Sequence, residues 1–146
     1  MNTKVSEYKN KIELNGKVIH TLPDALLPLQ TSIEKSKYIL DLQPDWDGEN
    51  AEAYTENVWT KAISFLCEFS IDIHNTFGKI PVTPVIYHGP EGSIDILWKT
   101  DDLNLLLNIP KDEQPATFSG ENSLGQKYEG SLNTNNYSLS FLPHPF

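Results

Sequence analysis

Residues 55–78, TENVWTKAISFLCEFSIDIHNTFG, decide the fold, because they predict one long helix with a wide apolar face. Thr55 is a good N-cap, and Glu56 places a negative charge in the first helical turn. Gly78 stands where a glycine commonly ends a helix. Apolar residues recur at helical spacing or widen the same face: Val58, Trp59, Ala62, Ile63, Phe65, Leu66, Cys67, Phe69, Ile73 and Phe77. We therefore expect this helix to lie at the centre of the molecule.

After residue 82 the apolar period changes to two, which predicts β-strands. The clearest strand segments are VTPVIYHG (82–89), SIDILWK (93–99) and LNLLLNI (103–109). ATFSG (116–120) and QKYEGSL (126–132) are weaker strand segments. Short turns separate all of them, and short turns favour antiparallel pairing between consecutive strands.

The region before the long helix predicts a hairpin and a shorter helix. KIELNGKVIH (11–20) alternates around Asn15-Gly16, a strong hairpin signal, but its arms are short and must pack on another element. A cap at Thr31 or Ser32 begins a helix that runs to about Leu42 and is ended by Pro44.

Two further prolines, Pro23 and Pro28, are expected to break any regular structure ahead of that helix.

These elements predict an α+β fold, with two helices packed on one face of a four- to five-stranded antiparallel meander. The length of 146 residues is that of a single domain, 1–146. Within it we expect a partly irregular N-terminal segment with the hairpin (1–30), the helices (31–78), and the meander with a tail (79–146).

Charge and composition exclude several partners. All 11 basic residues are lysine, no arginine is present, and the formal net charge is −9. Arginine supplies the planar fork that grips phosphates and base edges, so we expect no nucleic-acid partner. The negative charge also repels anionic membranes, and no apolar run approaches the ~20 residues that a membrane helix needs.

The cysteine content and the N-terminus indicate a cytoplasmic protein. Cys67 is the only cysteine, so no disulfide can form within the chain. Its apolar neighbours predict a buried core residue rather than a reactive thiol. The first residues, MNTKVSEYKN, lack the apolar segment of a signal peptide.

Between the two predicted helices lies an acidic corner, DLQPDWDGENAEAYTE (41–56). It contains six acidic residues, no basic residue and the tripeptide Trp46-Asp47-Gly48. A tryptophan beside an Asp-Gly turn indicates a shaped corner rather than a flexible linker. We expect Trp46 to be mostly buried at the junction of the two helices.

The arrangement around this tripeptide resembles a family of small, uncharacterised bacterial and archaeal proteins. They share a WDG motif after one helix, an alanine-rich start to a second helix, and a β-meander with a Gly-turn-strand-Trp pattern. The matching segments here are 46–48, 59–66 and 89–98, and the resemblance covers about residues 30–132. Where the family continues with Tyr-Gly-Ala, this chain has Glu49-Asn50-Ala51. The resemblance implies the fold, and it supplies no activity.

The alternating carboxylates Asp45, Asp47 and Glu49 are the first candidate site, because hard cations prefer several oxygens on a turn. Counted from Asp45, an EF-hand loop is matched by Glu56 at its last position, but its required glycine falls on Asn50. The competing interpretation is structural: Asp47 caps the turn and its tryptophan neighbour fills space.

Histidines give no metal motif. They lie in separate segments, at His20, His74, His88 and His144, without HxH or HExxH spacing. His88 is the most informative, because it ends a predicted strand beside a Gly-Pro turn. No catalytic residue, metal ligand or cofactor is predicted, and no GxSxG or phosphate-loop motif occurs.

Two function classes remain. The first is a small non-catalytic accessory protein that binds another protein, for which the acidic surface suits a basic partner. Its predicted binding residues are Asp45, Trp46, Asp47, Glu49 and His88. The alternative is a metal-dependent hydrolase that uses the Asp45/Asp47/Glu49 corner.

The outer face of the predicted sheet is a second candidate surface. Leu97 and Leu106 occupy positions that strict alternation would make polar. Three covers are open: the C-terminal tail 137–146, a second copy of the chain in a homodimer, or a foreign partner.

Overall fold

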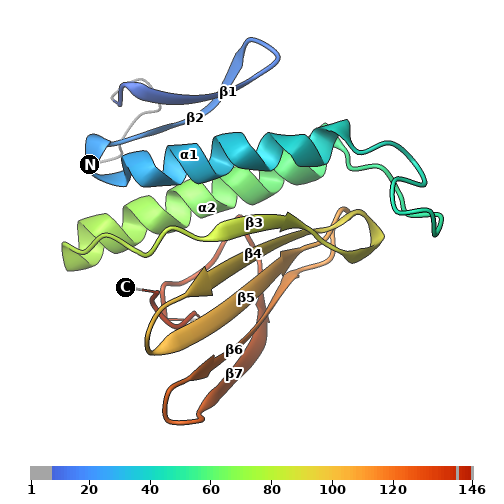
Figure 1. Cartoon of the computed structure of the whole chain (residues 1–146). Coiled ribbons are helices and arrows are strands. Elements are labelled where there is room, and N and C mark those ends of the chain that lie inside the picture. The colour runs from blue at the N-terminus through green and yellow to red at the C-terminus, as the bar shows by residue number, and fades with distance from the viewer. Residues whose placement is uncertain (1–7, 141, 146) are drawn as a thin grey trace.

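The chain folds into three layers with the helices in the middle (Figure 1). A two-stranded hairpin, β1 (Asn10–Leu14) and β2 (Lys17–Leu22), lies on one side of the helices. A five-stranded sheet lies on the other side, with strand order β3-β4-β5-β6-β7. The structure, a computed structural model, describes residues 8–140 and 142–145. The predicted α+β fold and the Asn-Gly hairpin are confirmed.

The sheet is an antiparallel meander in which every strand pairs with the next along the chain. Its strands are β3 (Val85–His88), β4 (Ile94–Lys99), β5 (Leu103–Ile109), β6 (Ala116–Asn122) and β7 (Lys127–Leu132). Alternate residues of β4 and β5 point toward the helices and are buried. The period-two pattern therefore predicted both the strands and their inner face.

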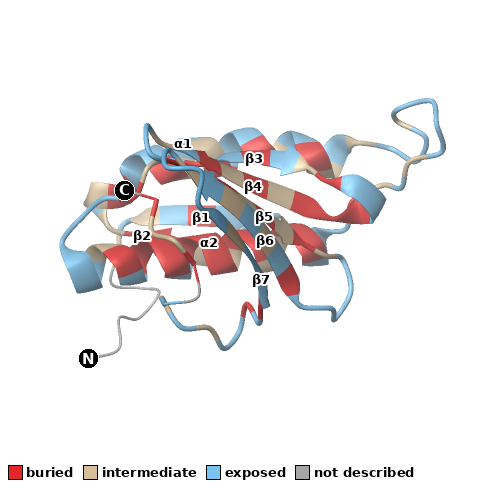
Figure 2. Cartoon of the chain, turned by 90° about the horizontal axis from the view of Figure 1, so that it is seen from below, coloured by how far each residue is buried: buried red, intermediate tan, exposed pale blue. Residues whose placement is uncertain are grey.

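Helix α2 (Glu56–Phe77) has the predicted ends. The Thr55 side chain accepts a hydrogen bond from the Val58 N–H at 3.1 Å, and Gly78 has a left-handed φ of 67°. Eleven of its 22 residues are buried, because β2 contacts it on one side while β4 and β5 contact it on the other. Figure 2 shows buried residues along α2 and largely exposed strands β6 and β7.

Helix α1 (Leu27–Ser36) begins and ends earlier than predicted. A 3-10 turn, η2 (Asp24–Leu26), leads into it, and a 3-10 segment, η3 (Lys37–Asp41), follows it. Pro28 occupies the first helical turn, where its missing N–H costs nothing, so the prediction that it breaks regular structure was wrong.

The C-terminal tail packs on α2. The Tyr137 ring lies 5.1 Å from Phe65 and 6.3 Å from Phe69, and its hydroxyl donates to the Asp72 carboxylate at 2.8 Å. Leu142 is buried farther along the tail. The tail therefore lies on the helix side of the sheet, while residues 141 and 146 lie outside the described residues.

That position excludes the tail, the first of the three covers considered, as the cover of the outer sheet face. Tail residues find apolar surface on α2, whose buried face is wider than β4 and β5 cover. Leu97 and Leu106 stay half-buried on the far side of the sheet.

Cys67 lies in the core as expected, where burial raises the pKa of its thiol. Across the described residues, no helix is both long and apolar enough to cross a membrane.

Two fully buried tryptophans offer a test of the core. The indole N–H of Trp59 donates to the Ser36 hydroxyl at 3.0 Å, which joins α2 to α1. The indole N–H of Trp98 has no hydrogen-bond partner among the described residues.

We expect Trp59→Phe to lower the free energy of unfolding by about 1–3 kcal/mol more than Trp98→Phe, because only the first leaves a buried hydroxyl without its donor. Urea denaturation of both variants measures the difference. Equal losses would contradict the assigned role of the Trp59–Ser36 bond.

Candidate functional site

The candidate site lies at one end of the molecule, where the connection between η3 and α2 meets the turn between β3 and β4 (Figure 1). A cavity of about 380 Å³ opens between them. Its lining includes three rings and three carboxylates: Trp46, Tyr54, His88, Asp47, Glu52 and Glu91. We call this cavity the Trp46 pocket.

The rings form one side of the pocket. Ring centroids are 4.7 Å apart for Trp46 and His88, 6.3 Å for Trp46 and Tyr54, and 6.5 Å for Tyr54 and His88. The Trp46 indole N–H donates to the Glu52 carbonyl at 3.1 Å, and the Tyr54 hydroxyl donates to the Gly89 carbonyl at 2.6 Å. Backbone acceptors thus hold the polar edges of Trp46 and Tyr54, and the three rings, tilted by 45–74° to one another, form one wall of the pocket.

Tyr38, from η3, orients the imidazole of this wall. Its hydroxyl shares a hydrogen bond of 2.8 Å with Nδ1 of His88, and the two rings meet edge to face at 5.8 Å. His88 ends β3 at an inward position, paired with the buried Ile94. The site therefore brings together side chains from a helical segment, a loop and a strand end.

The carboxylates of the acidic corner hold their own loop. Asp45 Oδ1 accepts from the Asn50 N–H at 2.7 Å, and Asp47 Oδ1 accepts from the N–H groups of Glu49 and Ala51 at 2.8 and 3.1 Å. The hydrogen bond from Glu49 lowers the pKa of Asp47 below its ordinary value. The structural interpretation of Asp47 as a turn cap agrees with this geometry.

Left-handed backbone is concentrated around the pocket. Among described residues other than glycine, four have a positive φ, and three of these flank the pocket: Asp45 at 64°, Asn50 at 65° and Glu91 at 55°. Such conformations cost free energy in side-chain-bearing residues and cluster where a ligand or a partner is held.

Trp46 is not at the helix junction, which corrects the expectation from the sequence. It is half-buried, and it packs on His88 at the end of β3. Trp59 occupies the junction instead, bonded to Ser36 of α1. The loop reverses with positive φ at Asp45 and Gly48, and Trp46 packs against the sheet turn rather than between the helices.

The charge of the pocket is negative. Glu52 forms an ion pair with Lys111, whereas Glu91 has no ion-pair partner among the described residues. The pKa of Tyr54 is raised, first by burial and then by neighbouring acidic groups that include Asp95. An anionic guest is therefore disfavoured here, and a cationic one is favoured.

The five predicted binding residues separate into two groups. Trp46, Asp47 and His88 line the pocket together, whereas Asp45 and Glu49 are not among its lining residues. Within residues 8–140 and 142–145, no three His, Cys, Asp or Glu side chains are grouped so that they could hold a metal ion. Sequence reasoning missed four contributors: Tyr38, Glu52, Tyr54 and Glu91.

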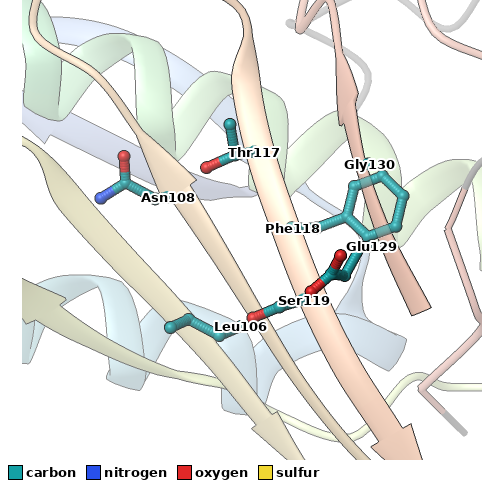
Figure 3. Close-up of a pocket in the computed structure, with 7 residues that line it drawn as sticks. All are labelled: Leu106, Asn108, Thr117, Phe118, Ser119, Glu129 and Gly130. Carbon is teal, nitrogen blue, oxygen red and sulfur yellow. The ribbon is translucent and has the colours of Figure 1, made fainter. Parts of the chain in front are cut away.

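A second hollow, of about 580 Å³, lies over the outer sheet face (Figure 3). Leu106, Ser119 and Glu129 form a row across β5, β6 and β7 in it. The Asn108 amide is already used, since it donates to Ser93 and Asp95. This open groove lacks the grouped rings and carboxylates that line the Trp46 pocket. The homodimer through this face stays a prediction.

Comparison of the chain with family models, with curated proteins and with solved structures found no match in any of the three. The resemblance to the WDG family therefore stays a prediction. The site rests on its own geometry.

The pKa of Asp47 should lie below the ordinary value of an aspartate, because the Glu49 amide donates to its carboxylate. Because its folded-state pKa lies below its unfolded value, its hydrogen bonds stabilise fully above pH ~3.9 and lose their effect as pH falls through the folded-state pKa. The side-chain carboxyl ¹³C shift, followed by NMR against pH, measures this midpoint. A midpoint at or above the ordinary value of about 3.9 would contradict the two amide bonds.

Divalent cations should leave the melting temperature unchanged apart from screening, because the Asp45 and Asp47 carboxylates serve backbone amides. Thermal melts with calcium, magnesium and manganese check this. A saturable rise that disappears in the Asp45→Asn, Asp47→Asn double variant would instead support the metal site.

Proposed function

We propose that this chain is a cytoplasmic, non-catalytic accessory protein that binds another protein through the Trp46 pocket. One observation carries the proposal. Three aromatic rings stand side by side at the edge of a cavity, while their polar edges are engaged by the backbone or by Tyr38. Rings held in this way offer contact area at little entropic cost, as the anchor residues of protein interfaces do.

The hydrogen bonding favours binding over catalysis. The Tyr54 hydroxyl is used by Gly89, Nδ1 of His88 by Tyr38, and Asp47 by two amides. A general base or nucleophile needs a free atom directed at the reacting group. Besides Nε2 of His88, which has no hydrogen bond among the described residues, the groups left for a guest are ring surfaces and the carboxylates of the rim.

The hydrolase alternative requires the carboxylates of the acidic corner to bind a metal ion. It requires Asp45, Asp47 and Glu49 to converge on a cation, yet the first two accept backbone amides within their own loop. No contact among the described residues favours this alternative over binding.

The proposal also assigns a role to each residue of the WDG tripeptide. Trp46 supplies the contact ring, Asp47 holds the loop through two amides, and Gly48 adopts a left-handed φ of 75°. If the resemblance to the WDG family holds, this corner is the feature that its members share for contact with a partner.

Affinity capture from the native host tests the proposal, with Trp46→Ala as the pocket variant. The loss of a central aromatic anchor costs about 2 kcal/mol or more, so the Kd for the partner should rise by about thirtyfold and its recovery should fall. Tyr87→Ala is the matched control, because Tyr87 is an exposed aromatic on the outer sheet face.

Quantitative mass spectrometry compares the three captures. We expect a partner retained by the wild type and the Tyr87→Ala control but lost from the pocket variant. Recovery of the same proteins by all three forms would contradict the proposal. Because Trp46 is only half-buried, its truncation should leave the fold intact, which circular dichroism verifies.

A further inference from the structure

We infer that the guest of the Trp46 pocket is an arginine side chain presented by the partner protein, an inference that rests on the proposed function. The ring spacing gives the first step. A group held between two ring faces needs about 7 Å, twice a ~3.5 Å contact distance. The ring centroids of the wall are only 4.7–6.5 Å apart, and the ring planes are tilted by 45–74° to one another. The guest must therefore lie against the face of one ring, where a flat group gains the most contact.

The carboxylates give the sign of the guest's charge. Asp47, Glu52 and Glu91 line the pocket, and Glu52 is already paired with Lys111. Gly92 packs against this ion pair so closely that an added Cβ would lie 3.1 Å from the Lys111 side chain, so Glu52 is held in place at the pocket. Glu91 is left without a cation among the described residues, and a positive guest supplies one.

A guanidinium meets both requirements. It is planar, stacks on aromatic faces, and is more weakly hydrated than an ammonium. Its N–H groups can form two parallel hydrogen bonds with one carboxylate while its face stays on a ring. A lysine ammonium is compact and strongly hydrated, so it gains less from contact with a ring face.

The sequence shows where the arginine must come from. The chain contains no arginine, so neither its own segments nor a second copy can supply this side chain. The occupant is therefore foreign, and the formal net charge of −9 attracts a basic segment toward the pocket.

Capped pentapeptides with a single variable residue test the inference directly. Gly-Gly-Xaa-Gly-Gly with arginine, lysine or citrulline is titrated into the ¹⁵N-labelled full chain. The readouts are the NMR signals of the Trp46 indole and of the Gly89 and Gly92 amides, which border the pocket. We expect saturable shifts with arginine, binding about three- to tenfold weaker with lysine, and none with citrulline, which keeps the shape but lacks the charge.

Glu91→Gln supplies the variant, and Glu121→Gln, an exposed glutamate of β6, supplies the matched control. Glu91→Gln should raise the Kd of the arginine peptide by about three- to tenfold, and Glu121→Gln should leave that Kd unchanged. Equal binding of arginine and citrulline, no binding of arginine, or indifference to Glu91→Gln would each overturn the inference.

The capture experiment separates this result from the proposed function. If Trp46→Ala still abolishes partner capture while the arginine peptide fails to bind, the pocket binds a partner by other chemistry and only the arginine assignment falls.

Discussion

The burial of α2 on both sides is the constraint on which the rest of the structure depends. A two-stranded hairpin is marginal alone, and the meander needs a cover for its apolar inner face. One helix serves both, since β2 contacts it on one side and β4 and β5 on the other. The C-terminal tail packs on the remaining apolar surface of α2, where Tyr137 contacts Phe65 and Phe69. A helix with a narrower apolar stripe could support only one of these layers.

The pocket follows from where α2 begins. Thr55 caps the helix, and the residue before the cap, Tyr54, reaches the carbonyl of Gly89 in the sheet turn. That bond places the start of the helix against the first turn of the meander. The loop 45–51 then closes through its own carboxylate–amide bonds. Core and site are joined at Tyr54 and His88, whereas the loop 45–51 is held by local carboxylate–amide bonds that the core does not need.

Local signals predicted much of the fold, and tertiary contacts account for the misses. Capping and periodicity located α2, Asn-Gly located the hairpin, and alternation located the strands. The start of α1 was missed because Pro28 can either break a helix or occupy its first turn, and local sequence does not separate the two. The site was predicted only in part: Trp46, Asp47 and His88 do meet at one cavity. Tyr38 and His88 are 50 residues apart, and no local pattern reports such a contact.

The composition of the chain gives the pocket a specific character. The chain has no arginine, and both ion pairs among the described residues use a lysine ammonium, as Lys111 does with Glu52. A site that selects guanidinium over ammonium would then face no competition from its own chain, whereas an internal arginine could occupy it. Long-range charge adds a different effect, because it raises the rate of encounter with basic partners without choosing among them. Selection of guanidinium over ammonium must come from short-range geometry. A planar cation gains more contact with a ring face, and the Glu91 carboxylate orients it.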